Sequence, residues 1–245
     1  MKKGFSHRLF CTLLLLLAVL TALSAVSAQA AAKKKLPKSV KVYDANGKLS
    51  SVTNYTYDNR GNLKSTTVKR YANGKLTKTE KLKYKNTYWK GSKYLKKRVE
   101  KRDNYTYTTT YSKKGVAQTE VYQYSDGGVD EFKLKYNKKG DLVSAAKYDG
   151  SGKLVFTTKY RLTYKNGRVV KKINKDKAGS TYTYYYDKHG NMTKFAFLSS
   201  DGTKVVSIYK ITYKNGYRKS QDQYTDGVYN GKTVYTYTAK KYSVQ

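Results

Sequence analysis

The stretch Tyr-Arg-Leu-Thr-Tyr-Lys-Asn-Gly-Arg at 160–168 decides the fold, and it returns almost unchanged as Tyr-Lys-Ile-Thr-Tyr-Lys-Asn-Gly-Tyr at 209–217. Aromatic and aliphatic side chains alternate with basic and hydroxyl side chains, which is the two-residue period of a β-strand with one apolar face. Asn-Gly then supplies a two-residue turn whose twist suits a β-hairpin. The repeat therefore predicts a duplicated block of β-hairpins.

The same period extends into the residues before each copy. One face of the first strand should carry Phe156, Thr158, Tyr160, Leu162 and Tyr164, and the matching face of the second should carry Val205, Ser207, Tyr209, Ile211 and Tyr213. We expect these side chains to face the core as scaffold. The basic residues between them, such as Arg161 and Lys210, should then lie on the other face, where they are free to meet a partner.

Glycine turns divide the rest of the chain into short strands. They stand at positions 47, 61, 74, 91, 115, 127, 140, 152, 167, 179, 190, 202, 216 and 227. One turn type is Tyr-Asp-x-x-Gly, as at 57–61, in which the Asp can bond the backbone ahead and the Gly can take a positive φ. The other is Asn-Gly or Asp-Gly, as at 71–76 and in Ser-Asp-Gly at 200–202.

The spacing predicts an all-β protein. No helical period is present after residue 30, and a flat sheet would leave one apolar face in water. We therefore expect an antiparallel meander of repeated hairpins that forms a twisted, curled sheet, either solenoid-like or an open barrel or roll.

The N-terminus is typical of an exported protein. Residues 1–30 combine a basic start, an apolar run and small residues ending in Ala28-Gln29-Ala30, which predicts a signal peptide. A membrane anchor is the alternative, but the apolar run is short for a bilayer. Residues 31–41 are interpreted as a basic leader or linker, and residues 42–245 as the hairpin repeat domain. We expect a secreted, extracellular or cell-surface-associated protein without a transmembrane segment after cleavage.

Composition points to anionic partners. The chain has 51 Lys and Arg against 16 Asp and Glu, a net charge of +35, and its basic residues are spread along the whole length. Outside a cell, such a charge favours anionic wall polymers, acidic polysaccharides, lipid head groups or nucleic acid. The alternative is a lysine-covered surface that only keeps the sheet soluble. The 28 tyrosines suit both half-buried sheet faces and sugar stacking.

Residues for catalysis are scarce. After residue 30 the chain has a single histidine, His189, and no cysteine, which excludes a Cys/His zinc site there. The neighbouring acids Asp130 and Glu131 should face opposite ways on a strand. Loop 174–179 lacks the full ligand set of a calcium loop. We therefore predict a protein that is not an enzyme and has no cofactor or metal; a cell-wall-acting enzyme is the third hypothesis for function.

Two segments carry a family resemblance. Tyr-x-Tyr-Asp-x-x-Gly-Asn-Leu at 55–63 and Tyr-Tyr-Tyr-Asp-Lys-His-Gly-Asn-Met at 184–192 resemble the YD repeat of Rhs-type and teneurin-type proteins. The resemblance implies a long spiralling sheet of hairpins, which forms a hollow shell in toxins and a carbohydrate-contacting surface in adhesion proteins. Residues 71–86 are more weakly similar to MORN-variant hairpins.

The leading hypothesis is a secreted, non-catalytic repeat protein that binds cell-envelope polyanions or glycans, or that serves as a surface scaffold. Lysines would contact anionic groups, and tyrosine rings would stack on sugars. An extracellular nucleic-acid-binding protein is the alternative, since it uses the same residue types. The candidate ligand-binding residues are the outward Lys159, Arg161 and Lys210, together with Lys171, Lys172 and Tyr217 beside the repeated turns.

Overall fold

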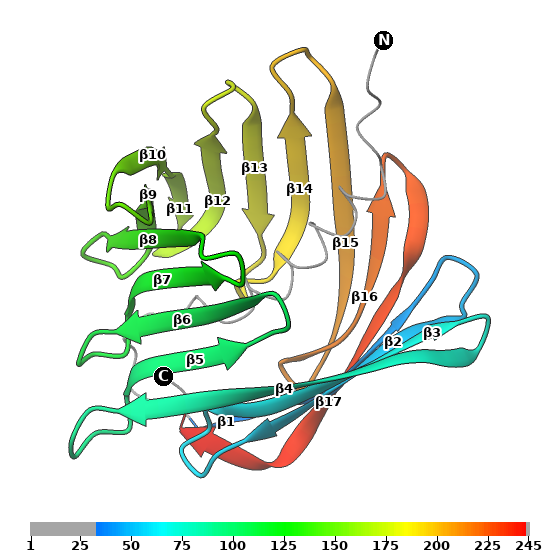
Figure 1. Ribbon diagram of the computed structural model, residues 1–245. Coiled ribbons are helices and arrows are strands. Elements are labelled where there is room, and N and C mark those ends of the chain that lie inside the picture. The colour runs from blue at the N-terminus through cyan, green and yellow to red at the C-terminus, as the bar shows by residue number, and fades with distance from the viewer. Residues whose placement is uncertain (1–32, 244–245) are drawn as a thin grey trace.

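The computed structural model describes residues 33–243, which form a single antiparallel β-sheet (Figure 1). The predicted signal peptide, residues 1–30, lies outside the described residues. The strands are β1 (Lys33–Tyr43), β2 (Leu49–Tyr57), β3 (Leu63–Ala72), β4 (Lys75–Tyr88), β5 (Leu95–Lys101), β6 (Tyr105–Tyr111), β7 (Ala117–Tyr124), β8 (Val129–Tyr136), β9 (Leu142–Asp149), β10 (Leu154–Lys159), β11 (Arg161–Lys165), β12 (Arg168–Lys175), β13 (Thr181–Tyr186), β14 (Met192–Leu198), β15 (Lys204–Lys214), β16 (Tyr217–Thr225) and β17 (Val228–Ser243).

The strands form a meander that almost closes on itself. Consecutive strands pair from β1 to β10 and again from β11 to β17, and β1 also pairs with β17. No ladder joins β10 to β11, which are two parts of one extended segment separated by Tyr160. The result is a barrel-like sheet with one unsealed seam, and it confirms the predicted all-β, curled meander.

Strand β1 lies where the sequence predicted a basic leader. The segment 31–41 was expected to precede the sheet, but residues from Lys33 onward pair with β17, and residues from Ser39 onward pair with β2 as well. Pro37 falls at register shifts in the pairing with β17, where a missing N–H is tolerated. The described sheet therefore begins at Lys33 rather than at residue 42, because this strand joins the two ends of the meander.

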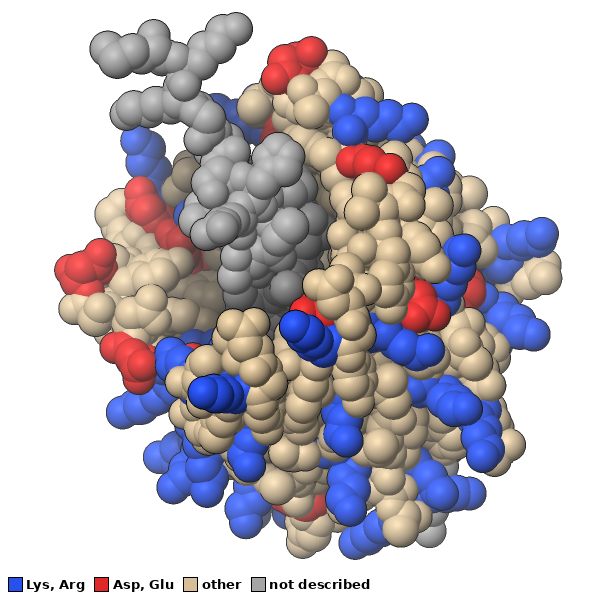
Figure 2. Space-filling view, turned by 90° about the vertical axis from the view of Figure 1, so that its right-hand side faces the viewer, with Lys and Arg blue, Asp and Glu red and all other residues tan. Residues whose placement is uncertain are grey.

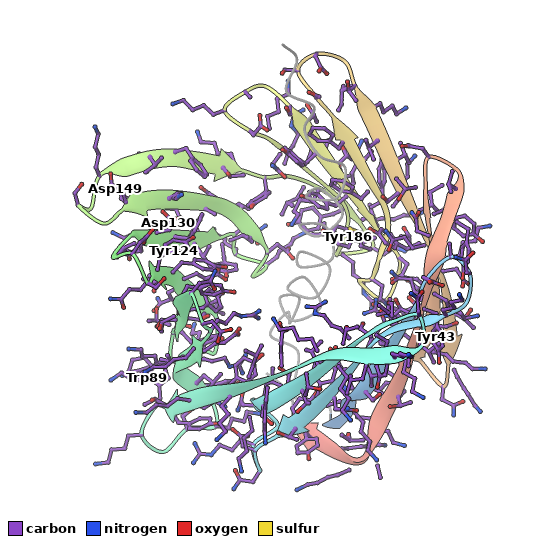
Figure 3. The ribbon with its side chains drawn as sticks, turned by 45° about the vertical axis from the view of Figure 1, so that its right-hand side comes forward. Tyr43, Trp89, Tyr124, Asp130, Asp149 and Tyr186 are labelled. Atoms are coloured by element: carbon purple, nitrogen blue, oxygen red, sulfur yellow. The ribbon has the colours of Figure 1, made fainter. Side chains whose placement is uncertain are left out.

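The two faces of the sheet differ as the two-residue period predicts. Along 157–164 the even-numbered side chains are half-buried and the odd-numbered ones are exposed, whereas Phe156, which was expected to face the core with them, is 38% exposed. Along 205–213 the odd-numbered side chains are the more buried, with Tyr209 only 4% exposed. Tyr209 packs with Tyr184 and Phe195 in a small core on the inner face. Tyr186, labelled in Figure 3, packs against the same cluster.

The turn glycines behave as predicted. All fourteen positions predicted as turns have a positive φ, which a residue with a Cβ adopts only at a cost. Asn73, Asn166, Asn215 and Asp226 also have a positive φ, as the two-residue turns require. The Ser-Asp-Gly turn differs from the prediction, because Gly202 N–H donates to the carbonyl of Ser199 and Asp201 keeps an ordinary φ. It therefore belongs with the longer Tyr-Asp-x-x-Gly turns.

Successive hairpins are offset along their strands, most clearly at β4. Residues 75–83 of β4 pair with β3, whereas residues 84–88 pair with β5. The segment 154–165 repeats this arrangement, since its first part pairs with β9 and its second part with β12. In β15, residues 204–208 pair with β14 and residues 207–214 pair with β16. The end of such a strand thus passes beside the turn of an earlier hairpin.

At these crossings, a tyrosine hydroxyl from the passing strand meets a carboxylate and an amide of the turn. Tyr213 Oη donates to Asp187 Oδ2 and accepts from Asn191 Nδ2 at 2.7 Å. Asp187 Oδ1 also accepts the backbone N–H of Asn191 at 2.9 Å, which closes the turn itself. Tyr88 makes the same contacts with Asp58 and Asn62. We call each such group a turn–tyrosine triad.

The third triad has its carboxylate and amide exchanged. Tyr164 Oη donates to Asp141 Oδ2 at 2.9 Å and accepts from Asn137 Nδ2 at 2.7 Å. Here the Asn stands first in the turn and its Oδ1 accepts the backbone N–H of Asp141. The triad therefore requires one carboxylate and one amide, in either order.

A cationic or imidazole side chain from the turn covers each triad tyrosine. The guanidinium carbon of Arg60 lies 4.1 Å from the ring centroid of Tyr88, and Lys139 Nζ lies 4.2 Å from that of Tyr164. The ring of His189 lies 4.5 Å from that of Tyr213. A cation is attracted to the face of an aromatic ring, so Arg60 and Lys139 help to hold Tyr88 and Tyr164 in place.

Removal of one triad hydroxyl should destabilise the fold. Tyr213→Phe leaves Asp187 Oδ2 and the Asn191 amide without their partner, so the free energy of unfolding should fall by about 1–3 kcal/mol. Urea unfolding followed by tyrosine fluorescence measures the loss. Tyr185→Phe is the matched control, because it also removes one hydroxyl group but lies outside the triads. The ring of Tyr185, which the variant keeps, contacts two lysines. Equal stability of both variants would contradict a stabilising role for the triad.

Gly231 should tolerate no side chain. Its φ is +133°, and an added Cβ would overlap the carbonyl oxygen of Tyr43, the β1 residue labelled in Figure 3. Gly231→Ala should therefore lower the free energy of unfolding by about 2–4 kcal/mol. Gly47→Ala is the control, since Gly47 has a positive φ but open space around it, and it should cost about 1–2 kcal/mol. Thermal unfolding of both variants tests the difference.

The inner tyrosines should make stability fall in alkali. Burial raises the pKa of six of them to about 12, whereas an exposed tyrosine ionises near 10.0. These are Tyr55, Tyr88, Tyr122, Tyr136, Tyr182 and Tyr186. Because the folded state holds these protons longer than the unfolded state, the stabilisation present below pH 10 is lost as pH rises toward 12. Denaturant midpoints should fall over that window, and absorbance titration should show a late tyrosine phase; a single phase near pH 10 would contradict this.

Candidate functional site

Four of the six candidate residues lie on the outer face of the sheet. Lys159 ends β10 and Arg161 begins β11, and both side chains are exposed. Lys171 lies on β12 and Lys210 on β15. Lys159 and Arg161 flank the seam, whereas Lys171 and Lys210 belong to a row of side chains that crosses the strands.

The other two candidates have structural contacts. Lys172 lies on the inner face, with Nζ 4.9 Å from the ring centroid of Tyr160 and 4.8 Å from that of Tyr184, and burial lowers its pKa. Tyr217 Oη accepts the backbone N–H of Lys35 at 3.2 Å, and its ring lies 5.0 Å from that of Tyr237. Lys172 therefore packs against the core tyrosines, and Tyr217 helps to join β16 to β1.

The outer row follows from the register of five neighbouring strands. Residues directly opposite each other on paired strands share a face. The sequence of opposite residues runs Lys171, Tyr185, Lys194, Ile208 and Tyr224, from β12 to β16. With strands about 4.8 Å apart, these four steps span about 19 Å. We call these five residues, together with Lys210, the lysine–tyrosine row.

Ammonium groups lie close to the tyrosine rings of this row. Lys171 Nζ and Lys194 Nζ each lie 5.4 Å from the ring centroid of Tyr185, and they reach it from the two neighbouring strands. Lys210 Nζ lies 4.6 Å from the ring centroid of Tyr224. Ile208 between them is 43% exposed. The row therefore combines three cations, two half-buried rings and one exposed aliphatic side chain.

Within residues 33–243, Lys171, Lys194 and Lys210 take part in no ion pair. Asp222 lies directly opposite Lys210 on β16, but its carboxylate pairs with Lys232 at 3.8 Å. The three ammonium groups lie near aromatic rings, an interaction that leaves the positive charge available to an anion. The row can thus bind anionic groups without first breaking a salt bridge.

Most acidic side chains have structural contacts away from the lysine–tyrosine row. Many close turns, as Asp44 does by accepting the backbone N–H of Lys48 at 2.8 Å. Others face inward, such as Glu100, which is 8% exposed and pairs with Arg102. Glu120 also faces inward, and burial raises the pKa of its carboxyl group. Figure 2 shows the consequence on one side of the molecule, where blue Lys and Arg are spread over most of the described surface and red acids are few.

The acids considered for catalysis do not converge. Lys147 Nζ lies 2.9 Å from Asp130, whereas Lys133 Nζ lies 4.0 Å from Glu131, so these neighbours face opposite ways as predicted. Figure 3 shows Asp130 beside Tyr124, whose hydroxyl donates to it at 3.3 Å. Among the described residues, His, Cys, Asp and Glu form no group of three that could hold a metal ion.

Sequence reasoning missed Tyr185, Lys194 and Tyr224. Tyr185 and Lys194 stand at alternate positions of clear strands, so the two-residue period could have placed them on the outer face. Their meeting in one row depends on the register of β13 with β14 and of β15 with β16. That register includes a shift between Tyr185 and Tyr186, which the sequence pattern alone does not specify.

No helix within residues 33–243 is long and apolar enough to cross a membrane.

Comparison with known proteins supports the fold. No protein-family model matches the chain, and no curated protein matches its sequence. A porin-like protein from Bacteroides uniformis has a similar crystal structure, with a TM-score of 0.58 and 15% identity over 82% of this chain and 96% of its own. A porin-like protein from Bacteroides vulgatus has a TM-score of 0.51 and 8% identity over 84% of this chain and 100% of its own.

A toxin complex also matches in part. In the structure of TcdB2-TccC3-Cdc42, the match covers 76% of this chain and 12% of the toxin chain, with 15% identity and a TM-score of 0.29. That score is too low to support an argument. At the identities of all these structures, the similarity to the porin-like proteins shows the fold alone, a β-rich repeat architecture.

Proposed function

We propose that this chain is a secreted, non-catalytic hairpin repeat protein of the YD-repeat type that binds linear anionic polymers of the cell envelope. The lysine–tyrosine row is the binding surface. Its cations contact anionic groups along the polymer, while the rings of Tyr185 and Tyr224 offer faces for sugar units. The observation that carries the proposal is that Lys171, Lys194 and Lys210 lie unpaired beside these rings.

The assignment to the YD-repeat type rests on the turns. In that repeat Tyr-Asp precedes the turn glycine, and here Asp58 and Asp187 each close a turn and accept a tyrosine hydroxyl. These two contacts give the Asp of the motif a physical role. They support the resemblance seen in 55–63 and 184–192.

Removal of the three positive charges of the lysine–tyrosine row tests its role in binding. The variant Lys171→Ala, Lys194→Ala, Lys210→Ala should lose about tenfold or more in affinity for a glycerol-phosphate polymer and for a sulfated polysaccharide. The slope of log affinity against log salt should also fall by about 2–3. Retention on immobilised polymer at two salt concentrations measures both quantities.

A second triple variant serves as the matched control. Lys81, Lys83 and Lys85 are exposed on the outer face of β4, far from the row in the ladder, and their replacement by Ala changes the net charge equally. This control should lose much less affinity than the row variant. If both variants bind alike, or if the natural chain shows no salt-dependent retention, the row is not the site and only a scaffold role is left.

The nucleic-acid alternative makes a different prediction. Stacking of a base on a protein ring is worth about 1–3 kcal/mol. Tyr185→Ala should then weaken single-stranded DNA binding more than it weakens binding of the glycerol-phosphate polymer, which has no ring to stack. A larger loss for DNA, together with tighter DNA binding by the natural chain, would favour the alternative.

A further inference from the structure

Strand β10 leaves one backbone edge unpaired at the seam. Its other edge pairs with β9 from Leu154 to Lys159. On the open side, β12 pairs with β11 only as far as Ile173 opposite Arg161, and β12 then continues toward its own turn. Within residues 33–243, the N–H and C=O groups along this side of β10 therefore have no ladder partner. A free strand edge is a template for an added strand.

The open edge is apolar and borders a groove. Leu154, Val155 and Phe156 are consecutive and are 51%, 46% and 38% exposed. A groove of about 580 Å³ lies beside them, with residues 155–158 on one wall and residues 175–178 on the other. Figure 3 labels Asp149 in the turn that leads into this strand. One wall of the groove thus offers both free backbone N–H and C=O groups and exposed apolar side chains.

The comparable edge of β4 is protected in the usual way. Residues 75–83 pair only with β3, so their other edge is also open. That segment carries a lysine at 75, 78, 81 and 83, and lysines discourage pairing with another chain. In β10 the single lysine stands at the end, at Lys159. Of these two open edges, only that of β10 lacks the lysines that repel a partner.

The far wall of the groove is positive. Lys175 and Lys177 are exposed, and neither forms an ion pair or a ring contact within the described chain. The carboxylate of Asp176 between them accepts the backbone N–H of Ser180 at 2.9 Å and the hydroxyl of Tyr182 at 3.0 Å, so the wall carries two lysines against one carboxylate. A second copy of this chain, with a net charge of +35, would be repelled. The charge favours an acidic partner.

We propose that the groove at the seam binds an extended segment of another protein, in which apolar and acidic side chains alternate. The segment adds to β10 as an antiparallel strand, the orientation found throughout the sheet. Its apolar side chains, on one face of the added strand, cover Phe156, and its carboxylates, on the other face, meet Lys175 and Lys177. This site is separate from the lysine–tyrosine row and does not depend on the proposed function.

A designed peptide tests the site with the full chain. The probe is a blocked peptide of about eight residues that alternates Val and Glu, long enough to cover β10. Hydrogen exchange should show protection of amides in 154–159 at about 1 mM peptide. A Val–Lys peptide of the same length should give none, because it meets a positive wall. A Val–Glu peptide with two internal prolines should also give none, because proline cannot complete the ladder.

Two variants locate the binding. The double variant Lys175→Glu, Lys177→Glu should weaken Val–Glu peptide binding about five- to tenfold, whereas Lys81→Glu, Lys83→Glu on β4 should leave it nearly unchanged. The proposal is overturned if residues 154–159 gain no protection, or if the Val–Lys peptide binds equally well. It is also overturned if sedimentation shows a dimer that Phe156→Glu dissolves, since a second copy would then occupy the edge.

Discussion

The hydrogen bond between a turn carboxylate and the hydroxyl of a tyrosine on a later strand is the contact on which the rest of the sheet depends. One oxygen of Asp187 closes its own turn, and the other holds Tyr213, so a single side chain joins local and long-range structure. The chain has no cysteine after residue 30, and few of its apolar side chains are deeply buried. Ladder pairing and these triads therefore hold the offset hairpins in register.

The same use of carboxylates produces the electrostatic character of the surface. Acids that close turns or face inward cannot neutralise lysines on the outer face, and the outward Asp222 and Glu131 pair with lysines outside the lysine–tyrosine row. On the inner face some charges are paired, as in Glu100 with Arg102 and Asp130 with Lys147.

Local features of the fold were predictable from the sequence, and long-range ones were not. Positive φ at the turn glycines and the inward direction of Tyr160 and Tyr209 follow from residue type and a two-residue period. The pairing of β1 with β17 joins residues about two hundred positions apart, which no local pattern encodes. The strand over the predicted leader was missed for this reason, because only the closure of the sheet gives it two partners.

The candidate site was likewise predictable only where local sequence position decides which way a side chain faces. Lys210 was identified from its outward position, and Lys171 and Lys172 from their place beside a repeated turn, which does not reveal that Lys172 faces inward opposite Tyr184. Tyr217 looked like a surface ring beside a turn, yet its partner Lys35 lies at the other end of the chain.

The exchanged triad at Asn137 and Asp141 has a consequence for how related chains evolve. Because the tyrosine hydroxyl is satisfied by one carboxylate and one amide in either order, the two turn positions can drift together while the contact is kept. In related chains we therefore expect covariation between the first and fifth turn residues. A search pattern that fixes the aspartate in one place would overlook hairpins built on the same contact.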